Sequence, residues 1–200
     1  MGRRREFRIE DVVAKATEVF WRRGYAATAM SDVYEVTGLK PGSLYAVFKD
    51  KEELFRRCFE AYAAFFRQTL PTDRSGVPAI KAWLDLQARL ATEDPDRKGC
   101  LIVNTLAERE MHSEATRALA AGRLQEIRDF FIRQLSIALA RRELAPGLAV
   151  EAAADALVGA VVGIMALGRA GADRRMIEHV AQAAVASLER FIDRPFVNVI

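Results

Sequence analysis

The sequence predicts an all-α protein, and three observations support this prediction. No stretch of any length alternates apolar and polar residues in the way a half-buried strand does. Apolar residues instead recur at helical spacing, as Ile9, Val13 and Ala16 do near the start of the chain. Glycine and proline interrupt this pattern at intervals of one helix. We expect an N-terminal three-helix domain with a helix-turn-helix over residues 1–51, followed by a second helical domain over residues 52–200.

About nine segments with helical spacing are separated by residues that start or end helices. Gly24 and Gly38 supply C-terminal stops for the first two helices. Pro41 suits the first turn of the third helix, and either Thr28 or Ser31 is a candidate N-cap for the second. The expected helices cover residues 8–23, 30–37, 41–48, 51–70, 78–92, 98–110, 114–143, 149–169 and 174–192.

The fourth helix is expected to join the two domains. Asp50 is its candidate N-cap, and Glu53 follows three residues later as in a capping box. Pro71 and the polar run 72–76 end it.

Charge and cysteine content restrict the class of protein. Residues 1–51 contain ten Lys/Arg and seven Asp/Glu, against twenty of each in the rest, so the net charge of +3 lies in the first quarter and suits a polyanionic partner. Cys58 and Cys100 are far apart and form no Cys-x-x-Cys, which indicates neither a disulfide scaffold nor a metal site. No secretory signal follows Arg3–Arg5, and the charge-free apolar run Ala156–Gly168 is shorter than the ~20 residues that span a bilayer. We therefore expect a soluble, cytoplasmic chain with no membrane contact.

Residues 30–48 have the organisation of a helix-turn-helix. In this motif, two short helices packed on a third present one of them to DNA. Gly38 lies where the backbone must reverse. The apolar residues that can close a small core against the first helix are Met30, Val33, Leu39, Leu44 and Phe48.

The stretch from Phe20 to Phe55, FWRRGYAATAMSDVYEVTGLKPGSLYAVFKDKEELF, resembles the DNA-binding domain of the TetR family. The matching residues are Gly24-Tyr25, Thr28, Gly38, Gly42-Ser43-Leu44-Tyr45, Phe48 and Lys51-Glu52-Glu53-Leu54. Beyond the first quarter of the chain, only the number and lengths of the helices match. The resemblance implies a transcriptional regulator, by family habit a repressor. Such a protein binds a palindromic operator in double-stranded DNA as a homodimer and is released by a small-molecule ligand.

The resemblance also implies roles for individual residues. It makes residues 41–48 the recognition helix in the major groove, with Gly42 allowing close approach of the backbone and Tyr45 offering a hydroxyl to a phosphate. Ala46 and Val47 are smaller or less polar than the residues often found there, so any base contact they make is to a thymine methyl. The DNA-binding residues that the resemblance implies are Thr28, Lys40, Pro41, Gly42, Ser43, Tyr45, Lys49 and Lys51.

Two of these assignments have plain alternatives, and so does a DNA-binding role for Arg3–Arg5. Tyr45 can be an ordinary surface aromatic, and Lys49 a solvated charge. Arg3–Arg5 can form an arm that reaches the minor groove, or a solubilising tail.

The last two expected helices are rich in small and apolar residues. Gly159 and Gly163 lie four residues apart among several alanines, and an apolar stripe follows the last helix from Ile177 to Phe191. Burial within one chain explains this pattern, but the resemblance implies a four-helix homodimer interface. Two-fold symmetry then places the recognition helices about one DNA turn, ~34 Å, apart.

The middle helices are implied to enclose a pocket for an unknown inducer. The candidate lining residues are Phe65, Trp83, Cys100, Asn104, Phe130 and Met165. Large apolar residues at helical spacing are equally typical of an ordinary core. Cys100 lies in the first turn of an expected helix near Arg97 and Lys98, where its thiol pKa should be lowered. This suggests, as an alternative, a repressor that senses oxidants or electrophiles through Cys100, although a buried free cysteine is the commoner case.

Nothing in the sequence indicates catalysis or a cofactor. The chain contains two histidines, His112 and His179, and no HExxH, GxSxG, Walker-type or GxGxxG motif. A helical adaptor that binds protein rather than DNA is disfavoured by the intact Gly42–Tyr45 stretch. In the favoured mechanism, a ligand shifts the helix expected over residues 51–70 and thereby changes the separation of the recognition helices.

Overall fold

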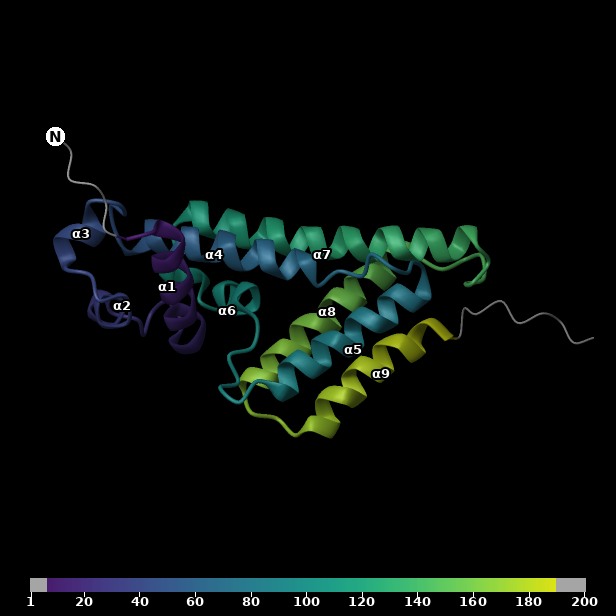
Figure 1. Ribbon diagram of the computed structural model, residues 1–200. Helices are drawn as coiled ribbons and strands as arrows, with labels where there is room; N and C mark the ends of the chain where they lie inside the picture. The colour runs from purple at the N-terminus through teal and green to yellow at the C-terminus, as the bar shows by residue number, and fades with distance from the viewer. Residues whose placement is uncertain (1–6, 190–200) are drawn as a thin grey trace, which may run out of the picture. The chain divides into compact units, whose positions relative to one another are not determined.

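The computed structural model describes residues 7–189, which fold into two compact units (Figure 1). Nine α-helices and one short 3-10 helix make up the regular structure of these residues, and none of them forms a strand, so the all-α prediction is confirmed. Unit 1 comprises residues 7–68 and 98–123, and unit 2 comprises residues 69–97 and 124–189. The functional boundary expected after residue 51 stays a prediction, because the compact unit that contains the helix-turn-helix extends beyond it.

Unit 1 is built around the first helix. Its elements are α1 (Ile9–Arg23), α2 (Met30–Thr37), α3 (Pro41–Tyr45), α4 (Lys51–Gln68), α6 (Leu101–Ala107), the 3-10 helix η1 (Arg109–Met111) and the start of α7 (Glu114–Ala140). Helix α1 packs against α2 and α4, and α4 packs against α6. The core between them contains Phe20, Val33, Leu44 and Phe55, all buried.

The predicted glycine stops are present in the structure. Gly24 has a φ of +86°, and its N–H donates to the carbonyl of Phe20 at 2.8 Å. Gly38 adopts the left-handed conformation with a φ of +70° and donates to Tyr34 at 2.9 Å. A side chain at either position would be strained, so these two residues set where α1 and α2 end.

The predicted N-cap of α2 was wrong. Ala29 occupies this position, and its N–H donates to the carboxylate of Asp32 at 2.8 Å. Thr28 instead turns inward and donates its hydroxyl to the carbonyl of Gly24 at 2.7 Å. Ser31 lies inside the helix.

Helices α3 and α6 are shorter in the structure than expected, for reasons that the backbone shows. Helix α3 ends at Tyr45 rather than at residue 48, since the N–H groups of Val47 and Phe48 both turn back to the carbonyl of Leu44. Helix α6 begins at Leu101 rather than at residue 98, because Arg97 and Gly99 have positive φ and the chain is extended at residue 100. The other expected bounds agree within three residues, except that the end expected at 192 lies outside the described residues.

Unit 2 contains α5 (Val77–Glu93), the rest of α7, α8 (Val150–Arg169) and α9 (Arg174–Glu189). Helices α5, α8 and α9 lie side by side and pack on one another (Figure 1). A Cβ at Gly168 would lie 2.8 Å from the carbonyl oxygen of Ala91, so α5 and α8 touch almost backbone to backbone. The indole of Trp83 packs on Phe130 and Phe131, with ring centroids 5.2 and 5.5 Å apart.

Helix α8 is unusually apolar. Among the helices in the described part of the chain, only α8 has the length and composition needed to cross a membrane. Its mean hydropathy is 1.9 over an 18-residue window. Only 28% of that window is buried within the chain. Core helices and partner-binding helices of soluble proteins share this composition, so the observation points first to an uncovered apolar face.

Candidate DNA-binding surface

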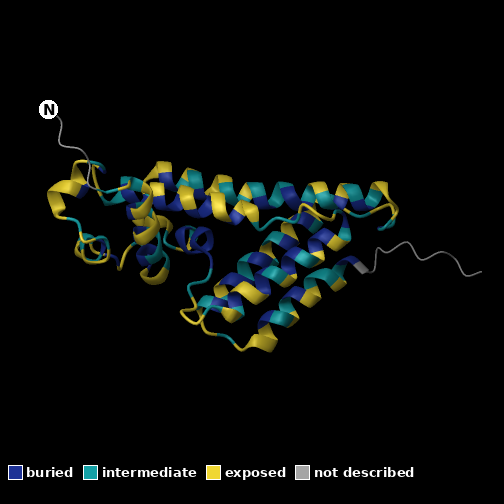
Figure 2. Ribbon diagram, viewed as in Figure 1, coloured by how far each residue is buried: buried dark blue, intermediate teal, exposed yellow. Residues whose placement is uncertain are grey.

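Helix α3 is anchored on one side and open on the other. Leu44 and Phe48 are buried in unit 1 and hold the helix in place. The side chain of Tyr45 is 49% exposed, and the residues from Lys40 to Ser43 are exposed as well (Figure 2). The structure thus brings five of the predicted DNA-binding residues onto one exposed helix.

Gly42 faces open space. A Cβ built on it would have no protein atom within 4 Å, and its φ is not in the left-handed region. Neither packing nor conformation within the chain therefore requires glycine at this position. Close approach of an external partner remains as a physical reason for it.

Tyr34 belongs to the same surface and was missed in the sequence. The Tyr45 hydroxyl is its hydrogen-bond partner and raises the pKa of Tyr34. This contact joins α2 to α3 across the turn. The two residues lie in different helices, so the periodicity of one helix does not relate them, and only the folded turn reveals the pair.

Thr28 and Lys51 lie behind α3 rather than on it. Thr28 is buried, and its hydroxyl is occupied by Gly24. Lys51 is the first residue of α4, and its Nζ lies 4.2 Å from the centre of the Tyr25 ring. Burial lowers the pKa of Lys51, while the charges of Glu108 and Glu52 oppose that shift.

The start of α4 is capped much as expected. The N–H of Glu53 donates to Asp50 at 2.8 Å, and the carboxylate of Glu53 accepts from the N–H of Lys49 at 2.9 Å. The side chain of Lys49 is exposed. Arg3–Arg5 lie outside the described residues.

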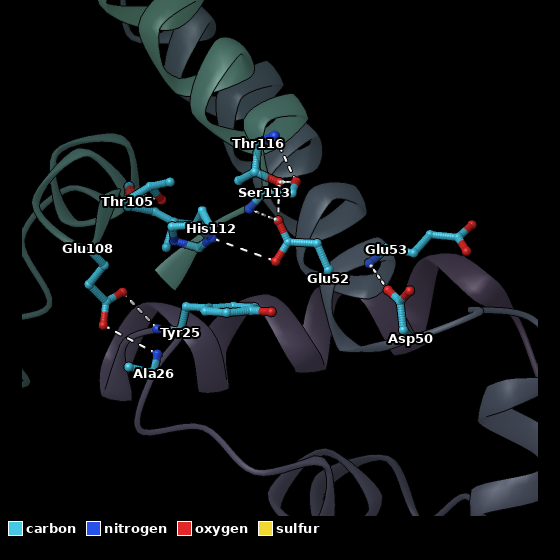
Figure 3. Close-up of polar contacts among 11 residues, drawn as sticks. Tyr25, Ala26, Asp50, Glu52, Glu53, Thr105, Glu108, His112, Ser113 and Thr116 are labelled. Atoms are coloured by element: carbon cyan, nitrogen blue, oxygen red, sulfur yellow. Dashed lines mark hydrogen bonds and ion pairs between the residues drawn. The ribbon is translucent and has the colours of Figure 1, made fainter. Parts of the chain in front are cut away.

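Behind the helix-turn-helix, the carboxylate of Glu52 joins α4 to the start of α7 (Figure 3). It accepts from the Thr116 hydroxyl at 2.6 Å and from the N–H of Ser113 at 3.0 Å. Burial raises the pKa of Glu52, but hydrogen bonds from Thr116, Tyr25 and Ser113 outweigh it and lower the pKa to about 2. Glu52 is therefore ionised at neutral pH.

A second carboxylate, Glu108, holds the turn between α1 and α2 (Figure 3). It accepts from the consecutive N–H groups of Tyr25 at 2.9 Å and Ala26 at 3.3 Å. The fit is close, since a Cβ on Gly24 would lie 2.7 Å from a Glu108 oxygen.

His112 lies between these two carboxylates. Its ring packs on Tyr25 at 4.4 Å and on Phe55 at 4.7 Å, and neither nitrogen has a hydrogen-bond partner among the described residues. Its Nδ1 is 3.8 Å from Glu52. Burial lowers the pKa of His112 against the opposing charges of Glu52 and Glu108, so the ring is neutral at pH 7.

The six pocket candidates are divided between the two units. Trp83, Phe130 and Met165 are buried in unit 2, whereas Phe65, Cys100 and Asn104 belong to unit 1. Phe65 is 58% exposed on α4. The amide of Asn104 donates to the carbonyl of Lys98 at 2.9 Å, which is a structural role.

The expectation of a lowered thiol pKa at Cys100 was wrong. Cys100 is 2% exposed, and burial raises its pKa. The nearby cation does not compensate, because Lys98 pairs with Glu18 at 2.9 Å. A redox switch through Cys100 is therefore not favoured. Among residues 7–189, no cluster of His, Cys, Asp and Glu could hold a metal ion.

Gln87 is a further residue that the sequence did not single out. It is fully buried in α5, and neither its amide oxygen nor its nitrogen has a hydrogen-bond partner among the described residues. An unpaired buried amide is costly, so such a group is often completed by water or a ligand. Its position between Trp83 and Ala91 on one helix face was the available signal.

Two family models match the chain. The N-terminal one, bacterial regulatory proteins of the tetR family, matches residues 12–58. The other, the tetracyclin repressor-like C-terminal domain, matches residues 76–184, more than half of the chain.

Individual proteins agree with these models. The HTH-type transcriptional repressor ComR of Escherichia coli is 32% identical over 108 residues, and the match covers 52% of this chain and 51% of ComR. The chain thus spans about half the length of this curated relative. The structure of a TetR transcriptional regulator from Chloroflexus aurantiacus is similar to this chain, with a TM-score of 0.82 and 28% sequence identity. The match covers 92% of this chain and 94% of that protein's chain. A cysteine mutant of the TetR family regulator CifR, bound to a 26-base-pair operator DNA, has a TM-score of 0.81 at 26% identity and covers 94% of this chain and all of its own.

Proposed function

The chain belongs to the TetR family of DNA-binding transcriptional regulators rather than to a family of enzymes, and we propose that it is a cytoplasmic repressor that binds a palindromic operator as a homodimer and is released by a small molecule. The observation that supports DNA binding best is α3, a short helix with buried anchors and an exposed face. Relatives named as repressors, and CifR bound to its operator, support the same role.

We propose that α3 enters the major groove. Ser43 and Tyr45 offer hydroxyls, Lys40 offers a charge, and the open side of Gly42 admits the DNA backbone. Pro41 fixes the first turn of the helix rather than donating a hydrogen bond. Lys49 and Lys51 are proposed to contact phosphates from the start of α4. Thr28 is proposed to act through the backbone around it, because its hydroxyl is already engaged.

We propose that the uncovered face of α8, with α9, forms the dimer interface. The small or apolar residues exposed along these helices are Ala152, Ala156, Gly159, Ala166, Met176, Ala183 and Ala186. Covering this face with a second copy would remove apolar surface from water, and small side chains allow close helix contact. Two-fold symmetry would then match a palindrome.

For the inducer, we propose a largely apolar molecule that carries one hydrogen-bonding group. Trp83, Phe130 and Met165 supply apolar surface in unit 2, and the unpaired amide of Gln87 can both donate and accept. No other buried polar side chain is present among the described residues of unit 2, so a charged group on the buried part of the ligand would lack a partner.

Binding to the DNA upstream of its own gene tests the proposal. The purified protein should retard a fragment with a palindromic site in a gel, with affinity that falls as salt rises. Tyr45→Ala and Lys51→Ala should each weaken binding by about 1–3 kcal/mol. Lys81→Ala removes an exposed lysine of unit 2 and is the matched control. Failure to bind any upstream fragment at low salt would exclude the proposed function.

A further inference from the structure

One segment of unit 1 contacts α1, the turn before α2, and α4. Residues 98–116 include α6, η1 and the start of α7. At its beginning, the carbonyl of Gly99 accepts from the Trp21 indole at 2.9 Å, and Lys98 pairs with Glu18, both on α1. At its end, Glu108 binds the turn before α2, and Ser113 and Thr116 bind Glu52 on α4.

The chain leads from this segment into unit 2 at both ends. Residue 97 precedes it in unit 2, and the chain re-enters unit 2 after residue 123, within the continuous helix α7. A change in unit 2 therefore has a covalent route into the segment on each side. The hydrogen bonds from Gly99, Glu108, Ser113 and Thr116 are the routes from the segment to the helix-turn-helix.

We propose that Glu108 and Glu52 are positioning residues for DNA binding, and that their carboxylates couple movement of residues 98–116 to the turn before α2 and to the start of α4. This inference rests on the proposed function. Neither residue is proposed to touch DNA. They act on Lys51 and on the backbone that precedes α2.

The Glu108 contact is suited to transmit a small movement. Two parallel hydrogen bonds to consecutive amides fix direction as well as distance, and charged acceptors make them strong. Tyr25, which carries one of these amides, also places its ring under Lys51. A shift of Glu108 would thus reach both the turn before α2 and the lysine at the start of α4.

Removing the charge of Glu108 distinguishes a positioning role from a direct electrostatic effect on DNA affinity. Removing a negative charge from a DNA-binding protein should, by Coulomb attraction alone, leave affinity unchanged or raise it. We expect Glu108→Gln to do the opposite and weaken operator binding about tenfold, the effect of losing roughly one charged hydrogen bond. Glu108→Asp keeps the charge but shortens the side chain, and it should weaken binding as well.

The matched control is Glu110, two residues away and exposed. Glu110→Gln and Glu110→Asp should leave affinity within twofold of the parent protein. All five proteins are compared in a gel with the same operator fragment, at a temperature where circular dichroism shows each to be folded. A purely structural role would lower the melting temperature without changing affinity under these conditions.

A second measurement needs no DNA. Amide hydrogen exchange of Tyr25 and Ala26 should accelerate about tenfold in Glu108→Gln, with no change in Glu110→Gln. Glu52→Gln should weaken operator binding without changing these two amides, since Glu52 meets Tyr25 through the side chain and both amides donate to Glu108. The inference is wrong if Glu108→Gln binds the operator as tightly as the parent and leaves both amides protected. Failure of the parent protein itself to bind would instead refute the proposed function, and the amide exchange would still test the contact.

Discussion

Units 1 and 2 are stabilised in different ways. Among the described residues, the buried polar side chains of unit 1 are Thr28, Asn104, Thr105, His112 and Thr116, whereas unit 2 has Gln87 alone. Hydrogen bonds between distant residues fix the relative positions of the elements in unit 1. Unit 2 has such bonds at the start of α5, from Gly76 to Gln134 and from Val77 to Glu143, but its interior depends on aromatic packing and close helix contact. Directional bonds specify one geometry, as reading DNA requires, while an apolar core can adapt to a ligand.

The largest effect is expected from the apolar core of unit 2. Trp83→Ala removes a fully buried indole from between two phenylalanines and should cost about 3–5 kcal/mol of unfolding free energy. Urea denaturation measures this change. Leu90→Ala, an exposed leucine on the same helix, is the control and should change stability by less than about 0.5 kcal/mol. A small effect at Trp83 would mean that unit 2 does not depend on this cluster.

In unit 1, removing the hydroxyl of Thr116 should lower the free energy of unfolding. Thr116→Val keeps the shape but removes the 2.6 Å hydrogen bond to Glu52, and should cost about 1–3 kcal/mol because a half-buried carboxylate loses a donor. Thr92→Val is the control, since that hydroxyl bonds only to carbonyls of its own helix. Equal effects of the two substitutions, measured by denaturation, would contradict the contrast between the units.

Acid should weaken unit 1 before unit 2. The pKa of His112 is lowered in the folded protein, so stability is fully present above its usual value of 6.5 and falls as pH drops below it. Glu52, with its pKa lowered to about 2 from 4.5, adds a further loss as pH falls from 4.5 toward 2. Amide exchange from pH 7 to 5 should show opening in unit 1 first. His112→Phe keeps the ring stacking and should flatten the loss between pH 6.5 and 5, and an unchanged profile would show that another group titrates.

The smallest expected change in unfolding free energy is a stabilisation rather than a loss. Gln87→Leu replaces an unpaired buried amide with an apolar side chain and should stabilise the free protein by about 1 kcal/mol while weakening the response to inducer. Gln134→Leu is the control and should destabilise, because that amide accepts from the N–H of Gly76 at 2.9 Å. Destabilisation by Gln87→Leu would show that the amide is paired in the folded protein.

Local signals in the sequence were sufficient for most of the fold. Gly24, Gly38 and Pro41 act within one turn of the backbone they control, so the ends of the first two helices and the start of the third could be placed closely. The shortened α6 could not be predicted, because it depends on the left-handed conformation of Arg97, a residue type that rarely adopts it. The exposed face of α3 followed from the motif.

Contacts between distant residues were beyond the sequence. Glu52 and Ser113 are 61 residues apart, and no periodicity relates them. Cys100 was misjudged for a similar reason, since its burial depends on Tyr62 and other residues that only the folded chain brings near. Pattern analysis therefore found the exposed surface of α3 but not the hydrogen bonds that hold the elements behind it.

The division of unit 1 into two separate stretches of chain has a practical consequence for engineering. A sensor module from another regulator cannot be joined to this helix-turn-helix at a single junction after residue 51, because the N–H groups of Tyr25 and Ala26 would then face a foreign segment in place of Glu108. A working chimaera should transplant residues 98–123 together with residues 1–68. Three splice points, at 68/69, 97/98 and 123/124, are then needed, the last of them inside an unbroken helix whose register must be preserved.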